Sequence, residues 1–379
     1  MSAQTITLGC RLNFAESEAM AAAAPERTLI VNSCAVTSEA VRQTRQAIRR
    51  AHRDQPDRPI IVTGCAAQLD PATFRAMPEV TEVRTRDDAL PARASAGLIH
   101  AVKSFVAVQT GCDHRCTFCT IWTARGPSRS VAYDEVRNAV ERELSRGAKE
   151  IVLTGVDITD YTGGLGVLCQ RLLSDLPELT RLRLSSLDSI EIDGALLELI
   201  AGEPRLMPHF HLSLQAGDDL ILKRMKRRHS RAQAVTVVEA VKRARPEATI
   251  GADLIAGFPT ESEEAALNTL ALLDDCDVVA AHIFPFSPRP GTPAARMPQV
   301  EREIVKARAA RLRARAETRR SVWLDSLVGS RQRVLVENMS GHGHGESNAR
   351  VRLDGAAKGA IHHAAITARD GNHLIGICP

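Results

Sequence analysis

The sequence lacks the long apolar runs and the leader segment of membrane or secreted proteins. None of its apolar stretches approaches the roughly 18 residues that a membrane-spanning helix requires. Met1 to Leu8 contain no basic segment that leads into an apolar stretch, so we expect neither a signal peptide nor association with a membrane. We therefore expect a cytoplasmic protein. Its 379 residues are enough for two or three domains.

A compact disulfide framework is also missing. The cysteines number nine, which is odd, and six of them stand in contexts typical of metal ligands. Reduced thiols agree with a reducing compartment. We interpret Cys169, Cys276 and Cys378 as structural thiols, because they have no neighbours of the ligand kind.

Lysine is scarce, since arginine supplies 42 of the 49 basic residues. The net charge is only +4, but a dense basic stretch runs from Lys306 to Arg320. Such a local bias can mark a nucleic-acid surface. It is equally typical of an exposed, solvated helix in an arginine-rich protein, and the stretch alone does not decide between the two.

Three cysteines in the run from Gln109 to Cys119 have no fourth partner nearby. Cys112, Cys116 and Cys119 form a Cys-x3-Cys-x2-Cys spacing, and the next cysteine lies far along the chain. Three thiolates leave one iron of a 4Fe-4S cluster open to bind a substrate, whereas clusters that only carry electrons are usually closed by a fourth cysteine. A zinc loop is the alternative, although zinc sites usually show a second Cys or His pair. His114 is the one other local ligand candidate, and we expect it to serve the loop backbone or to support the ligands.

The first hundred residues alternate short strand-like runs with helical stretches such as Ser38 to His52, a pattern typical of a Rossmann-like α/β domain. The ends of parallel strands converge at one sheet edge, where ligands bind in open α/β folds. Three cysteines placed there could hold a second cluster with an open iron, although buried free cysteine is also a common core residue. The strand-like runs are Thr5 to Leu8, Leu29 to Val31 and Ile60 to Thr63, followed by Cys10, Cys34 and Cys65 respectively.

The central region predicts a partial (β/α)6 barrel with a polar interior. The period of two in the run from His209 to Gln215 puts His209, His211, Ser213 and Gln215 on one face and apolar residues on the other. Each histidine taken singly is more typical of a satisfied core residue, but Arg181, Arg183 and Ser185 share a face in the same way. Because closed barrels fill their interior mainly with Val, Ile and Leu, we infer a polar cavity that holds a ligand. The expected strands are 105–108, 151–154, 181–185, 209–214, 249–256 and 278–284.

The tail predicts one long helix and then a small all-β barrel. The helix covers Val300 to Ser326, and the run from Gly341 to Glu346, rich in glycine and histidine, could suggest a metal site but is more typical of a flexible turn. The expected strands are 333–337, 348–352, 361–366 and 373–377.

With both cysteine triads and the barrel, the chain resembles the methylthiotransferase family of radical S-adenosylmethionine (SAM) enzymes over almost its whole length. The resemblance implies an N-terminal methylthiotransferase domain (1–98), a radical SAM domain (99–328) and a TRAM-like RNA-binding domain (329–379). Two positions depart from the family's usual pattern, with Trp122-Thr123 in place of a Pro-Tyr pair and Ala66 in place of a tyrosine. The motifs that carry the resemblance are Thr7 to Asn13, Asn32 to Glu39, Ala124 to Ser130, Ser287 to Pro293 and the Cys112 run with Phe118.

The resemblance implies two 4Fe-4S clusters, one held by Cys112, Cys116 and Cys119 and an auxiliary one held by Cys10, Cys34 and Cys65. In the family, SAM cleavage at the first cluster yields the radical that removes hydrogen from the substrate carbon, and the auxiliary cluster carries the sulfur. The cofactors perform the reaction and the protein excludes water and positions them. By analogy, Gly155, Asp157, Ser185 and Gln215 would line the SAM pocket.

The residues in these motifs most resemble those of the class that modifies threonylcarbamoyladenosine at position 37 of tRNA. Related classes act on isopentenyladenosine in tRNA or on an aspartate of a ribosomal protein, and these remain alternatives. A third alternative is a non-catalytic iron-sulfur protein that binds RNA or transfers electrons, in which the clusters stabilise the fold. The expected partners are the tRNA anticodon loop, an electron donor such as flavodoxin or ferredoxin, and a sulfur donor.

Overall fold

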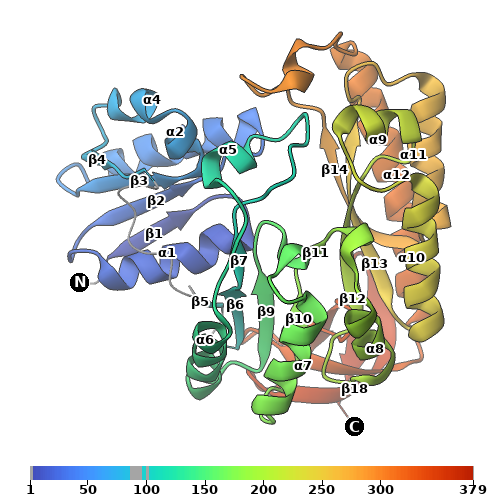
Figure 1. Ribbon diagram of the computed structural model, residues 1–379. Helices are drawn as coiled ribbons and strands as arrows, with labels where there is room; N and C mark the ends of the chain where they lie inside the picture. Colours follow the sequence, from blue (N-terminus) through green and yellow to red (C-terminus); the bar gives the residue numbers. More distant parts are fainter. Residues whose placement is uncertain (1–2, 86–95, 100–101, 379) are drawn as a thin grey trace.

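The computed structural model describes residues 3–85, 96–99 and 102–378 (Figure 1). Its N-terminal part is a parallel sheet with strands in the order β1 (Gln4–Thr7), β2 (Leu29–Ser33), β3 (Ile60–Gly64) and β4 (Glu82–Val83). The first three strands are those predicted from the sequence, whereas the two-residue β4 is too short to give a pattern. The helices of this part are α1 (Arg11–Ala23), α2 (Ser38–Asp54), α3 (Cys65–Leu69) and α4 (Pro71–Arg75).

The central strands form the predicted partial barrel as two half-sheets. The first half contains β5 (Ala96–Ile99), β6 (Lys103–Ala107), β9 (Glu150–Thr154) and β10 (Leu182–Leu184). The second contains β11 (Ser186–Leu187), β12 (His209–Gln215), β13 (Thr249–Ala256) and β14 (Val278–Pro285). All neighbouring strands are parallel except β5, which pairs antiparallel with β6. The single strand expected over 181–185 is divided, with Ser185 between β10 and β11.

Helices surround the barrel strands on the outside (Figure 1). They are α6 (Tyr133–Ser145), α7 (Leu165–Asp175), α8 (Gly194–Gly202), α9 (Asp219–Met225), α10 (Arg231–Ala244) and α11 (Glu263–Asp275). On β12 the outward residues Phe210, Leu212 and Leu214 are at most 1% exposed and join the core beneath these helices. The inward residues His211, Ser213 and Gln215 are less buried, so the predicted alternation of a polar inner face and an apolar outer face is confirmed.

Helix α1 packs against the inner face of β6 at the open side of the barrel. Phe14 and Ala15 of α1 share a small core with Phe105 and Val152, while Val106 faces the outer core with Val136 of α6. The Phe14 and Phe105 rings meet edge to face with centroids 5.9 Å apart. The N-terminal part therefore closes the side that the incomplete barrel leaves open (Figure 1).

The tail consists of α12 (Arg302–Ser326) and a closed barrel of five strands in the order β15-β16-β17-β19-β18. These strands are β15 (Arg331–Val336), β16 (His342–His344), β17 (Arg350–Leu353), β18 (Ile361–Asp370) and β19 (His373–Ile377). The small all-β barrel expected from the sequence is thus confirmed. Among the described residues, no helix combines the length and the apolar character needed to cross a membrane.

The prediction of a flexible turn over 341–346 is wrong, because β16 occupies residues 342–344 and pairs with both β15 and β17. Gly343 allows this pairing, since a Cβ atom there would lie 1.9 Å from the Leu335 carbonyl oxygen. The glycines that suggested a turn instead allow a close approach of strands.

The tail barrel closes the N-terminal end of the central barrel. Arg181, just before β10, donates to the carbonyl oxygens of Arg333 and Gly345 at 3.4 and 3.3 Å. Thr249, the first residue of β13, donates to the Ser347 carbonyl at 3.0 Å. With that end covered by protein, the opposite end, where the loops after the strands lie, is the end at which we expect a ligand site.

Candidate active site

The loop with Cys112, Cys116 and Cys119 connects β7 (Gln109–Thr110) to the short helix α5 (Ile121–Arg125). Backbone hydrogen bonds shape it, with the Cys112 N–H donating to Gly126 and the Cys119 N–H to Cys116. Gly111 precedes the first cysteine with φ +79°, and a Cβ atom there would lie 1.9 Å from the Pro127 carbonyl oxygen. Only glycine fits this turn, so the backbone itself places the three thiols.

Burial disfavours the ionised form of these thiols. It raises the pKa of Cys112 to about 12 and that of Cys119 to about 11. A cluster ligand must be a thiolate, and bound metal displaces the proton. The donor set therefore fits an iron-sulfur cluster, whose irons would displace the thiol protons.

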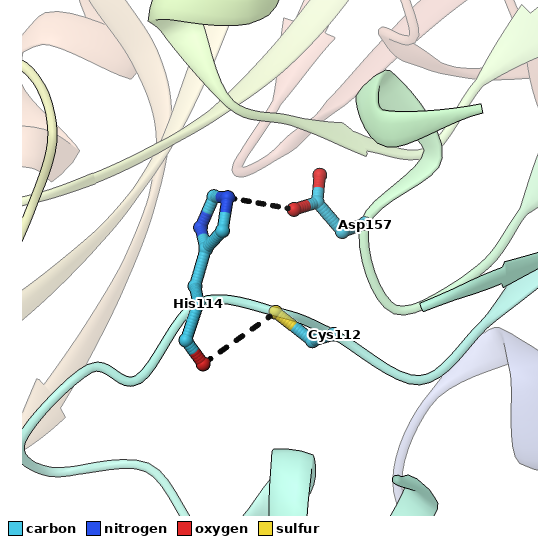
Figure 2. A group of neighbouring side chains, drawn as sticks. All are labelled: Cys112, His114 and Asp157. Atoms are coloured by element: carbon cyan, nitrogen blue, oxygen red, sulfur yellow. Dashed lines mark hydrogen bonds and ion pairs between the residues drawn. The ribbon is translucent and has the colours of Figure 1, made fainter. Parts of the chain in front are cut away.

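Asp157, predicted for the SAM pocket, lies beside this loop (Figure 2). Its carboxylate is 3.4 Å from His114 Nε2, and Cys112 Sγ lies 4.0 Å from the His114 carbonyl oxygen. The imidazole also faces Asp188 at 3.6 Å and Glu191 at 3.5 Å. Burial raises the pKa of Asp157, against a hydrogen bond from Thr159 and the nearby imidazole. His114 thus connects the cysteine loop to a group of carboxylates.

The other predicted pocket residues lie at the same end of the barrel. Gly155 follows β9, and a Cβ atom there would lie 2.8 Å from the Gln109 carbonyl oxygen. Ser185 lies between β10 and β11, and Gln215 ends β12 with φ +67°. Neither of these two side chains forms a hydrogen bond within the described residues. The structure therefore brings Asp157 to the cysteine loop and leaves Ser185 and Gln215 available for a ligand.

The second triad lies at the C-terminal edge of the N-terminal sheet, as the sequence predicted. Cys10 follows β1, Cys34 follows β2 and Cys65 follows β3, and the three strands are parallel and in register. Cys34 and Cys65 are buried and Cys10 is exposed. Burial raises the pKa of Cys34 to about 11, and proximity to the other two sulfurs adds to the shift. Three thiols thus converge on one side of the sheet.

Arg125 links the two triads, a contact that sequence analysis missed. It is the last residue of α5, and its Nε donates to Cys65 Sγ at 3.3 Å. The rest of its guanidinium binds the Glu16 carboxylate at 2.7 and 2.8 Å and Asn13 Oδ1 at 2.7 Å. Cys65 is also near enough to Cys119 to raise its pKa slightly. The presence of Arg125 in the motif from Ala124 to Ser130 was the available signal, but Glu16 and Asn13 are more than a hundred residues away.

Two further arginines lie near the cysteine sites, and their roles were not predicted. Arg227 lies 3.8 Å from Cys116 Sγ through Nη1 and donates through Nη2 to Asp188 at 2.9 Å. Arg289 donates to Ser38 Oγ at 2.9 Å, which joins the barrel to the N-terminal part near Cys34. Both side chains place positive charge near sulfur, which suits anionic iron-sulfur clusters.

The basic stretch of α12 is largely engaged in ion pairs. Arg308 pairs with Glu261, Arg315 with Asp274, and Arg319 also with Asp274, at 2.7 to 2.9 Å. Because these acidic residues belong to α11 and the loop before it, much of the charge fixes α12 to the barrel. The helix therefore offers less free positive charge to RNA than its sequence indicates.

A partial barrel with a Cys-x3-Cys-x2-Cys loop at its open end defines a radical SAM protein. The Radical SAM superfamily model matches residues 106–273, and a model described as an uncharacterized protein family, UPF0004, matches residues 2–84. Among solved structures, the radical SAM methyltransferase TsrM from Kitasatospora setae aligns with a TM-score of 0.53 and 13% identity. That alignment covers 72% of this chain and 65% of TsrM, and it supports the fold alone.

The chain belongs to the tRNA methylthiotransferase family of radical SAM proteins. It is 42% identical to the threonylcarbamoyladenosine tRNA methylthiotransferase MtaB of Rickettsia prowazekii, over 93% of this chain and 91% of that protein. MtaB of Aquifex aeolicus is 32% identical, over 87% and 91%. A tRNA-2-methylthio-N(6)-dimethylallyladenosine synthase of Erythrobacter litoralis is 29% identical, over 89% and 86%.

Proposed function

We propose that this protein is an enzyme that adds a sulfur atom and a methyl group to carbon 2 of N6-threonylcarbamoyladenosine at position 37 of tRNA. The observation that carries the proposal is the convergence of two cysteine triads, bridged by Arg125 between Cys65 and the loop after β7. A methylthiolating enzyme needs its sulfur source beside the carbon from which hydrogen is removed. The two sites therefore have to adjoin, and the contact of Arg125 with Cys65 supports such an arrangement.

Cys112, Cys116 and Cys119 would hold the SAM-binding cluster, and Cys10, Cys34 and Cys65 the auxiliary cluster. When bound, the clusters and SAM supply the radical that activates the adenine carbon and the sulfur and methyl group that it receives. Around them, Gly155 would allow close approach of SAM, and Asp157, Ser185 and Gln215 would bind its polar groups. Arg125 would hold the Cys65 ligand in place through its Nε–H.

The partners follow from this activity. The RNA is the tRNA anticodon loop, and the tail barrel from residue 329 onward would bind its phosphates. The reaction consumes electrons and sulfur, so it requires a donor such as flavodoxin or ferredoxin and a sulfur donor. The gap between the two family matches supports a domain boundary near residue 98. The start of the closed five-stranded barrel at β15 supports another near residue 328.

Nucleoside analysis of total tRNA from cells lacking the gene tests the proposed substrate. We expect the 2-methylthio form of threonylcarbamoyladenosine to disappear and its precursor to accumulate. Loss of the isopentenyl counterpart would instead identify the dimethylallyladenosine class, to which the relatives near 29% identity belong. Unchanged tRNA would exclude both and favour the ribosomal-protein aspartate.

Two single-cysteine variants test the assignment of the triads on purified, anaerobically reconstituted protein. Cys116→Ala should abolish formation of 5′-deoxyadenosine from SAM, whereas Cys34→Ala should retain it and lose methylthiolation. Each variant should bind about four irons instead of about eight. Cys169→Ala is the matched control, since that thiol is buried in the core away from both triads. Turnover of SAM by both triad variants alike would contradict the division of roles, and the absence of SAM turnover in the wild type would favour a non-catalytic protein.

A further inference from the structure

Arg11 places a solvent-exposed cation beside the Phe105 ring of β6. It follows Cys10 and begins α1, and its guanidinium carbon lies 5.5 Å from the centroid of the inward-facing Phe105 ring. The side chain is exposed to solvent, yet surrounding protein lowers its pKa, and the neighbouring Arg183 lowers it further. Arg11 therefore lies in a space that water reaches but that protein surrounds, between the auxiliary cysteine site and the barrel interior.

This guanidinium has no fixed partner. Among the described residues, no hydrogen-bond acceptor or carboxylate lies within bonding distance of Arg11. Arg183 also has an unused donor, because its buried Nη1 has no hydrogen-bond partner. On β10 the residues on either side of Arg183 face the outer core, so the alternation of the strand directs Arg183 inward. Arg11 thus has unsatisfied N–H groups that solvent reaches, and the neighbouring Arg183 adds a buried one.

The nearby carboxylates are already engaged. Glu150 pairs with Lys103, Arg181 and Arg183 at 3.2, 2.9 and 2.9 Å. Burial opposes the charge of Glu150, but these cations hold its pKa well below the usual value. The single Glu150 carboxylate thus faces three cations. A second carboxylate, that of Glu337, balances the charge of Lys103 alone, at 2.7 Å. This part of the interior therefore keeps an excess of positive charge.

Asp253, the other carboxylate near Arg11, is held by two histidines. Its Oδ1 lies 2.9 Å from His211 Nε2 and 3.0 Å from His282 Nδ1. Gly251 makes room for this arrangement, since a Cβ atom there would lie 2.3 Å from His211 Nδ1. The His282 side chain is 64% exposed, so solvent reaches the group. Arg11 remains available for an anion that comes from outside the protein.

We propose that Arg11, supported by Arg183, binds the carboxylate of the threonylcarbamoyl group and thereby selects this adenosine over one that carries an apolar isopentenyl group. The inference rests on the proposed function. A guanidinium binds a carboxylate through two parallel hydrogen bonds, whereas an isopentenyl group would displace water from the cation and leave it without a partner. Loss of that pairing is a strong means of discrimination between substrates.

The test compares two anticodon stem-loop RNAs on the reconstituted holoenzyme. One carries threonylcarbamoyladenosine, and the other carries threoninolcarbamoyladenosine, in which a hydroxymethyl group replaces the carboxylate. A charged hydrogen-bonded contact corresponds to roughly a 10- to 100-fold change in kcat/KM. We expect the wild type to prefer the carboxylate RNA by that factor, and Arg11→Met to act on both RNAs at about the lower rate. Arg11→Lys should retain part of the preference.

Iron content and RNA-independent formation of 5′-deoxyadenosine monitor the two cluster sites in each variant. Arg137→Met serves as the matched control, because Arg137 lies on the outer helix α6 and pairs only loosely with Glu141 at 3.8 Å. If Arg11→Met kept the wild-type preference, or if the wild type showed none, the carboxylate would be recognised elsewhere and the inference would be wrong. If the wild type acted on neither RNA, the proposed function itself would fail. If Arg11→Met lost iron, the test would use Arg11→Lys in its place. If Arg11→Lys preferred the carboxylate RNA as strongly as the wild type does, the inference would be overturned.

Discussion

Replacing Arg125 with methionine should release the cysteine loop from the N-terminal sheet. The substitution leaves Glu16 and Asn13 Oδ1 without the guanidinium that binds them at 2.7 to 2.8 Å. Breaking a buried ion pair by removing one partner costs about 3 to 5 kcal/mol. The Glu16 side chain is 20% exposed, so water can hydrate it in part and the lower value applies. The hydrogen bonds of Arg125 act as one unit, so their separate values are not added.

A loss of about 3 kcal/mol raises the open population of the loop roughly 150-fold. Amide hydrogen exchange measures this directly, because local opening limits the exchange of α5 amides. The amides of Ala124 and Gly126, bonded to Thr120 and Trp122, should exchange faster by about that factor. Strand β13, which has no contact with Arg125, should be unchanged.

Arg129→Met is the matched control, since Arg129 is exposed and lies four residues further along the chain. Arg125→Lys should restore only a small part of the protection, because an ammonium cannot bind Glu16, Asn13 and Cys65 at once. The reasoning is refuted if Arg125→Met exchanges like the wild type, or if the lysine variant is fully protected.

Two further predictions concern the tail and the cysteine loop. Burial opposes the charge of Glu337, but a hydrogen bond from His344 and the Lys103 cation hold its pKa at about 2, below the ordinary 4.5. Since the folded pKa is the lower one, this stabilisation is present above about pH 4.5 and is lost as the pH falls toward 2. When the pH is lowered from about 6 to 3, the free energy of unfolding measured with urea should fall by roughly 2 kcal/mol more in the wild type than in Glu337→Gln. Equal losses in the two proteins would contradict the assignment. In Gly111→Ala, the alanine would have to adopt a positive φ, and its Cβ atom would clash with the Pro127 carbonyl oxygen. The variant should therefore lose about half its iron and its SAM cleavage, while the auxiliary site persists. Full iron content would show that the turn can adjust.

Local patterns in the sequence were sufficient for most of the longer strands and for the grouping of the cysteines into two triads. Cys10, Cys34 and Cys65 could be grouped from the sequence because each follows a strand-like run, and parallel strand ends meet at one edge. The alternation from His209 to Gln215 likewise predicted a polar inner face. These inferences depend on spacing within a few residues, which the strand period fixes.

The pairing of distant residues could be decided only by the tertiary structure. Arg125 and Glu16 lie 109 positions apart, and no local pattern distinguishes Arg125 from the other arginines. The acidic partners of α12 and the use of Gly343 inside a strand depend in the same way on what packs alongside. The sequence by itself therefore determined which atoms are available for chemistry, whereas the tertiary structure decided which charges are compensated. Among the described residues Arg11 forms no hydrogen bond or ion pair, because the carboxylates near it, Glu150 and Asp253, are already engaged by other side chains.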